Sequence, residues 1–166
     1  MMKPVILVCR YAFGLAGLLA LALAVSVHAA TIAGIDVEAR YPSVWLFHYG
    51  IFPLVLAAVL VVFSLAPGAR FRDVVLLIPM TARILIVAVF TYAVANFFVI
   101  MPLSGAGDPM VRDGRFFLSD HGTLREVSEE QFHAQRSLAL RGFSGHWVFL
   151  YLVSTVYLLL ARAQGK

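Results

Sequence analysis

Five histidines are the side chains of this 166-residue chain that are best suited to chemistry. Imidazole nitrogens ligate transition metals and haem iron, and imidazole titrates near neutral pH. His28, His48 and His146 each fall at the end of an apolar stretch, at similar depth if those stretches are helices that cross a membrane. These three residues are therefore candidate metal or haem ligands. No histidine pair has a ligand spacing such as His-x-x-x-His, so ordinary hydrogen-bonded histidines at a membrane interface are the alternative.

Nucleophilic chemistry has weaker support in the sequence. Ser144 and His146 are separated by one glycine, but near neighbours on a helix point in different directions and do not form a catalytic dyad. A helix cap is the expected role of Ser144. A single cysteine, Cys9, excludes an intramolecular disulfide. We therefore expect no enzyme activity, and no cofactor unless the three histidines hold haem or a transition metal.

The composition places these residues in a membrane protein. Hydrophobic residues make up 61% of the chain and charged residues 13%, and the mean hydropathy is +0.89. Soluble domains contain about 25% charged residues, and a run of about 20 apolar residues can cross a bilayer as a helix. We predict an all-α polytopic membrane protein, a four-transmembrane-helix bundle that forms one membrane domain over residues 1–166. The predicted spans are residues 8–30, 44–66, 83–102 and 144–162.

The positions of the basic residues predict the orientation of these spans. Lysine and arginine are concentrated near both chain ends and in the loop between the second and third spans, where Asp73 is the only acidic residue. In the other two loops, acidic residues dilute the basic ones. An excess of Lys and Arg is typical of cytoplasmic loops. We therefore predict a multi-pass protein of the bacterial inner membrane with both termini in the cytoplasm.

The first span has a second interpretation. Lys3 and Arg10 together with the following apolar segment and Val27-His28-Ala29 are also typical of a secretory signal peptide. Cleavage would remove residues 1–29 and leave three spans. We favour a retained span because the apolar segment is long for a signal peptide.

The third apolar stretch, residues 74–102, is too long for a simple span. As one helix it would exceed about 40 Å, against about 30 Å of hydrocarbon. One solution is an interfacial segment over residues 70–82 followed by a span, with Arg83 reaching the cytoplasmic headgroups. The other is a single tilted helix with Arg83 inside the bundle. We favour the first solution because an unpaired buried charge is costly.

Residues 103–142 are the one substantial segment predicted to lie outside the membrane. Residues 104–109 have the composition of a loop. Two β-prone runs, residues 115–118 and 123–127, flank a turn that contains glycine and predict a hairpin.

A helix is expected to follow the hairpin. Ser128 and Gln131 have the spacing of a capping box, which predicts a helix start near residue 129. Gly142 is expected to end this helix, so that the fourth span begins separately near residue 144. The predicted fold is thus a bundle with a short extracytoplasmic hairpin-plus-helix insertion between spans three and four.

A stripe of small residues runs along the first span. Ala16, Ala20 and Ala24 are four residues apart, and His28 continues the series. Residues four apart share a helix face, and small residues allow membrane helices to approach closely. The stripe predicts packing within the bundle or against a partner, which would bring His28 near a neighbouring helix end. Further candidate partner-binding residues lie in or beside the outer segment: Phe116, Phe117, Phe132 and Arg141.

These features favour a protein that acts by binding. The expected partners are the lipid bilayer and either another membrane protein or a second copy of the chain, and no nucleic-acid-binding motif is present. In topology alone, the predicted layout resembles that of the four-span immunity proteins that neutralise pore-forming bacteriocins. An accessory subunit or an immunity-like protein is therefore expected. The alternative is a haem- or metal-linked membrane redox protein that uses His28, His48 and His146, which the predicted orientation places on the outer side.

Overall fold

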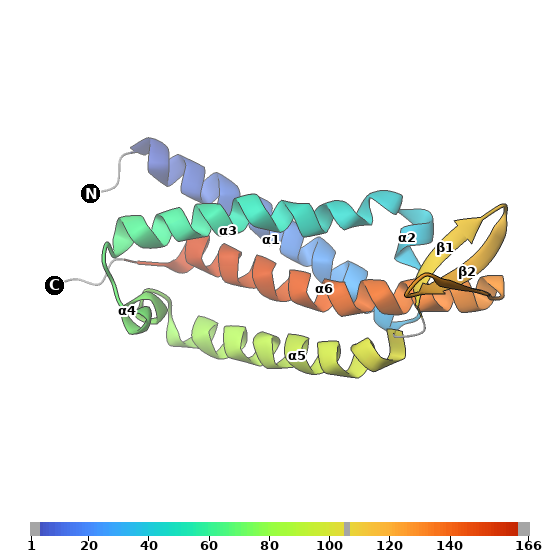
Figure 1. Ribbon diagram of the computed structural model, residues 1–166. Helices are drawn as coiled ribbons and strands as arrows, with labels where there is room; N and C mark the ends of the chain where they lie inside the picture. The colour runs from blue at the N-terminus through green and yellow to red at the C-terminus, as the bar shows by residue number, and fades with distance from the viewer. Residues whose placement is uncertain (1–3, 105–106, 163–166) are drawn as a thin grey trace.

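Four long helices dominate the structure, a computed structural model that describes residues 4–104 and 107–162. Each of the four is long and apolar enough to cross a membrane. The described residues begin and end at one end of the bundle, which we call the terminal end, and a small sheet lies at the other, which we call the sheet end (Figure 1). The four helices are α1 (Pro4–Ile32), α3 (Leu46–Leu65), α5 (Met80–Ser104) and α6 (Glu129–Leu160).

α6 is the central helix of the bundle. Half of its most apolar window is buried, against 22% for α1 and for α3 and 17% for α5. α1, α3 and α5 each pack against α6, whereas α3 and α5 do not pack closely on each other. Large apolar side chains such as Leu19, Phe52 and Phe98 face outward. Only α6 is therefore enclosed by protein over much of its length.

α6 runs without interruption through Gly142, so the predicted helix break there is wrong. The predicted role of Ser144 as a cap is also wrong, because Ser144 is fully buried within the helix. A glycine inside a helix costs only about 1 kcal/mol relative to alanine, and the packing of α6 against three helices outweighs this cost. The helix start is as predicted, since Ser128 and Gln131 exchange side-chain to backbone hydrogen bonds of 3.2 Å.

Two separate helices occupy the third apolar stretch. α4 (Phe71–Leu76) ends before Pro79, and α5 begins at Met80 rather than near residue 83. One continuous helix over residues 74–102 is thereby excluded, but Arg83 Nε is buried, as expected of the alternative with Arg83 inside the bundle. Arg83 lies near the start of α5, at the terminal end.

A three-stranded antiparallel sheet lies at the sheet end, in the order β1-β2-β3. β2 and β3 correspond to the predicted hairpin, whereas β1 occupies residues predicted partly as loop. Residues 105 and 106 of that loop lie outside the described residues. Asp113-Gly114 and His121-Gly122 form the turns with positive φ at all four residues, the conformation of tight hairpin turns. The strands are β1 (Asp108–Arg112), β2 (Arg115–Asp120) and β3 (Thr123–Glu126).

α1 meets α6 along a face of glycines. Gly14 lies against Leu159, and a Cβ added at Gly17 would come within 2.6 Å of the Thr155 hydroxyl oxygen. Glycine at these positions allows the two helices to approach closely, as small residues do in membrane proteins generally.

The alanine stripe predicted for the first span follows this contact face only in part. Ala24 is fully buried and Ala20 is partly buried, but Ala16 is exposed. Four residues advance a helix by about 400°, so a series with a strict spacing of four drifts away from a straight contact face. Ala16 therefore lies on the exposed side of α1, while Ala24 belongs to the core.

An ion cluster fixes the connection between α1 and α3, which contains α2 (Val37–Arg40) and the 3-10 helix η1 (Pro42–Trp45). The carboxylate of Asp36 accepts a hydrogen bond from Arg136 Nε at 2.7 Å and lies 2.6 Å from His133 Nδ1. Burial of the Asp36 carboxyl group raises its pKa. The hydrogen bonds from Arg136, His133 and the backbone of α2, together with the positive charge of Arg136, outweigh this effect and lower the pKa overall. The cluster therefore joins this connection to the first turns of α6.

We expect Gly17→Leu to lower the free energy of unfolding by about 1–3 kcal/mol, because the larger side chain would overlap Thr155. Ala16→Leu adds bulk on the exposed side of the same turn and should change stability by less than about 0.5 kcal/mol. Thermal unfolding of both variants in one detergent measures the difference. Equal stability of the two variants would contradict the close α1–α6 contact.

We expect Asp36→Asn to cost about 2 kcal/mol of folding free energy at neutral pH, since hydrogen bonds to a charged group are worth about 1.5–3 kcal/mol. The lowered pKa means that this stabilisation is fully present above the pKa of the unfolded carboxyl group and is lost as pH falls through the folded value. The stability difference from wild type should therefore shrink in acid. Asp113→Asn, at an exposed turn, is the control, and a pH-independent difference for Asp36→Asn would refute the cluster's role.

Candidate functional site

His28 lies where α1, α5 and α6 meet. Its side chain is buried, with Nδ1 2.8 Å from Ser144 Oγ on α6 and Nε2 2.6 Å from the Tyr92 hydroxyl oxygen on α5. The structure thus brings His28 to neighbouring helices, but it meets the middle of α5 and of α6 rather than a helix end as the small-residue stripe predicts. Ser144 and Tyr92 as its partners are not predictable from spacing, because they belong to different helices.

One arrangement of protons satisfies every group in this cluster. Ser144 Oγ lies 3.3 Å from the Arg141 carbonyl oxygen, to which it donates its proton. His28 Nδ1–H then donates to Ser144 Oγ, and the Tyr92 hydroxyl donates to the unprotonated Nε2. This chain uses both ring nitrogens of His28 and leaves no lone pair free for a metal. The fully buried hydroxyl of Ser144 joins helices rather than presenting a nucleophile to solvent.

Asn96 of α5 extends the cluster toward Arg141. Its Nδ2 donates to the Arg141 carbonyl at 3.2 Å, and a Cβ added at Gly145 would come within 2.9 Å of that nitrogen. Gly145 therefore permits the contact between α5 and α6. Asn96 Oδ1 and Arg141 Nε are buried without a hydrogen-bond partner among the described residues. The role of Arg141 as a partner contact stays a prediction, since its unpaired Nε is buried inside the bundle.

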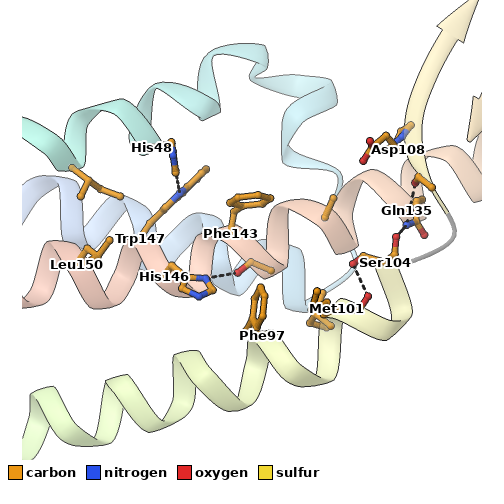
Figure 2. A pocket seen from close by; sticks show the side chains of 16 residues that line it. His48, Phe97, Met101, Ser104, Asp108, Gln135, Phe143, His146, Trp147 and Leu150 are labelled. Carbon is orange, nitrogen blue, oxygen red and sulfur yellow. Dashed lines mark hydrogen bonds between the residues drawn. The ribbon is translucent and has the colours of Figure 1, made fainter. Parts of the chain in front are cut away.

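Two cavities lie end to end along one face of α6 and share Leu150. The first, of about 470 Å³, lies at the sheet end between α3, α5 and α6 (Figure 2). The second, of about 590 Å³, lies nearer the terminal end between α3, α4 and α6. We call the two together the α6 groove. Its floor residues recur every few positions along α6: Gln135, Ala139, Gly142, Phe143, His146, Trp147, Leu150, Val153, Ser154 and Tyr157.

Two histidines line the sheet-end half of the α6 groove. Trp147 Nε1 donates to His48 Nδ1 at 3.3 Å, so a neutral His48 carries its proton on Nε2 (Figure 2). His146 Nδ1 donates to the Gly142 carbonyl at 3.0 Å, which leaves Nε2 of His146 as an acceptor. One histidine thus offers a hydrogen-bond donor and the other an acceptor within an otherwise mainly apolar lining.

The three predicted metal or haem ligands do not form one set. His48 and His146 line the same cavity, whereas His28 does not line it and both its ring nitrogens are used. Within residues 4–104 and 107–162, no three His, Cys, Asp or Glu side chains are arranged to hold a metal ion. Haem or metal held by His48 and His146 alone stays a prediction.

The phenylalanines predicted as partner contacts have different positions. Phe132 is 3% exposed, and its ring centroid lies 4.9 Å from that of Phe116. This pair packs β2 onto α6, so Phe132 is not available to a partner. Phe117 is partly exposed on the same strand. None of these phenylalanines lines the α6 groove, which sequence patterns do not indicate.

We expect Tyr92→Phe and Ser144→Ala each to lower the free energy of unfolding by about 0.5–1.5 kcal/mol, because each removes one hydrogen bond to His28. The two effects should be non-additive by at least about 0.5 kcal/mol, since both act through one ring. Ser26→Ala, which removes an exposed hydroxyl that bonds within α1, is the control partner for Tyr92→Phe. Unfolding of the single and double variants in detergent tests this, and additivity in both pairs would disprove the shared chain.

No protein-family model, no curated protein and no solved structure matches the chain. The function is therefore inferred from the contacts, cavities and charges of the chain itself.

Proposed function

We propose that this protein is a non-enzymatic binding protein of the bacterial inner membrane and that its α6 groove holds a transmembrane helix of a partner. The length of the groove carries this proposal. Its floor extends from Gln135 to Tyr157 on one helix, which is about 33 Å at 1.5 Å per residue. The hydrocarbon core of a bilayer is about 30 Å thick. A lipid acyl chain extends through one leaflet only, whereas a transmembrane helix crosses the whole hydrocarbon core and would fill the full length of the groove.

The side chains that line the groove suit a helix. Ala139, Gly142 and Ser154 on the floor and Ala58 on the α3 wall are small. Helix association in lipid depends on close van der Waals packing, and small residues permit it. The two groove histidines add a donor and an acceptor at the sheet end, which would fit one polar side chain on an otherwise apolar partner helix.

The proposed orientation places the terminal end in the cytoplasm. Arg70, Arg72 and Arg83 belong to this end, where Asp73 is the only acidic residue. Such an excess of arginine favours the cytoplasmic side. The sheet would then lie outside the membrane on the opposite side. A larger complex that this chain joins as an accessory subunit, a target that it neutralises within the membrane, and a second copy are the partner classes that fit.

Photo-crosslinking in native membranes tests the groove. A photoreactive amino acid at Val153 of α6 or Val59 of α3, both of which line the groove, should give one discrete adduct. Leu19 of α1 and Val87 of α5 are exposed apolar positions outside the groove and should give none. Mass spectrometry should assign the crosslinked peptide to a transmembrane segment of one membrane protein or of a second copy of this chain.

Filling the groove provides a second control. Leu150→Trp adds bulk where the two cavities meet, so it should abolish the adduct at Val153. Adducts of equal yield at groove and control positions, or an adduct that survives Leu150→Trp, would refute the proposal. A Soret band or stoichiometric metal in the purified protein, lost on changing His48 and His146 to alanine, would favour the redox alternative.

A further inference from the structure

Two arginines line a small cavity at the terminal end. The cavity has a volume of about 350 Å³ and lies between the α4–α5 connection and the end of α6. Arg83 of α5 and Arg162, which follows α6, line it together with Leu77 and Pro79. The backbone N–H of Arg162 donates to the Leu77 carbonyl at 2.9 Å, which holds the end of α6 against this connection.

Neither guanidinium group has an anionic partner among the described residues. Arg83 Nε is buried without a hydrogen-bond partner, and no described carboxylate forms an ion pair with Arg83 or Arg162. Asp73 instead accepts a hydrogen bond from the backbone N–H of Arg70 at the start of α4. Carbonyl groups at the end of α6 already accept hydrogen bonds from Arg10. The cavity therefore has unsatisfied positive charge.

We propose that this cavity binds the phosphate group of an anionic phospholipid. Guanidinium groups bind phosphate oxygens through paired N–H donors, so a phosphate would give Arg83 and Arg162 the anionic partner that the described residues do not supply. Basic pockets between membrane helices on the cytoplasmic side bind lipid headgroups in this way. The site is separate from the α6 groove, so the two proposals succeed or fail independently.

The apolar surroundings favour a lipid over a soluble anion. Leu77 and Ile78 are buried in an apolar cluster that continues onto α5 and α6. Leu160, which lines the cavity, and Met80 and Ile84 near the start of α5 are exposed. A phosphate held by the two arginines would therefore be attached to acyl chains that lie along exposed apolar side chains.

Native mass spectrometry of the full-length protein tests this site. The protein is released from bilayers that contain equal amounts of phosphatidylglycerol and phosphatidylcholine. We expect it to retain phosphatidylglycerol about tenfold better than phosphatidylcholine, because two arginines near a membrane surface both attract the anionic headgroup. Arg83→Gln with Arg162→Gln should abolish the preference. Arg70→Gln with Arg72→Gln removes the same charge from the same end outside the cavity and should preserve it.

Folding and soluble anions are tested separately. If the Arg83 and Arg162 double variant does not fold, the single variant Arg162→Gln provides the test, because this residue is exposed and its replacement should not disturb folding. The preference for phosphatidylglycerol should then fall about threefold. Equal retention of both lipids by wild type would overturn the proposal, and so would an equal loss of preference in the Arg70 and Arg72 variant. Displacement of the lipid by inorganic phosphate would identify a soluble anion as the ligand and would overturn the lipid assignment.

Discussion

The burial of α6 among the other three candidate spans is the constraint on which this structure depends. α1, α3 and α5 have one packing partner in common, and most of their remaining surface is apolar and exposed. Because lipid is as apolar as these surfaces, hydrophobic burial alone does not bring the helices together, and close contact must do so. Glycines at positions 14, 17 and 145 let α1 and α5 approach their neighbours. The same arrangement leaves α3 and α5 apart, so the α6 groove is a direct result of a bundle with one central helix.

Polar contacts give this bundle its specific alignment. In lipid an unpaired polar group is costly, so each pairing between helices favours one register over others. His28 links α1 to both α5 and α6 near the sheet end, and Arg10 links α1 to the last carbonyls of α6 near the terminal end. α1 is therefore held at two depths. Among the buried polar atoms that lack a partner in the described residues, Arg83 Nε belongs to a residue that lines a cavity, whereas Asn96 Oδ1 and Arg141 Nε lie between α5 and α6.

Local chemistry in the sequence predicts much of the fold, but not the site. Apolar length predicts four spans, and the capping box at Ser128 predicts where α6 begins, since neither depends on distant residues. The continuity of α6 through Gly142 depends on packing against other helices, which no local pattern contains. β1 is absent from the sequence-based prediction, although Asp113-Gly114 is a tight-turn signal, because the residues before it have the composition of a loop. The partners of His28 and the α6 groove depend on which helices touch, and one sequence does not specify that order.

Oxygen accessibility of spin labels on α6 tests the central claim, that one face of this helix is open to the bilayer. Cys9, the single cysteine, is exposed and can be replaced by serine before labelling. A label at Val153→Cys, on the floor of the groove, should collide with lipid-dissolved oxygen as often as a label at the outward-facing Leu19→Cys. A label at Leu158→Cys, which is fully buried, should be protected. Protection at position 153 equal to that at 158 in the purified protein would mean that the groove is closed, and would contradict this account of how the protein binds.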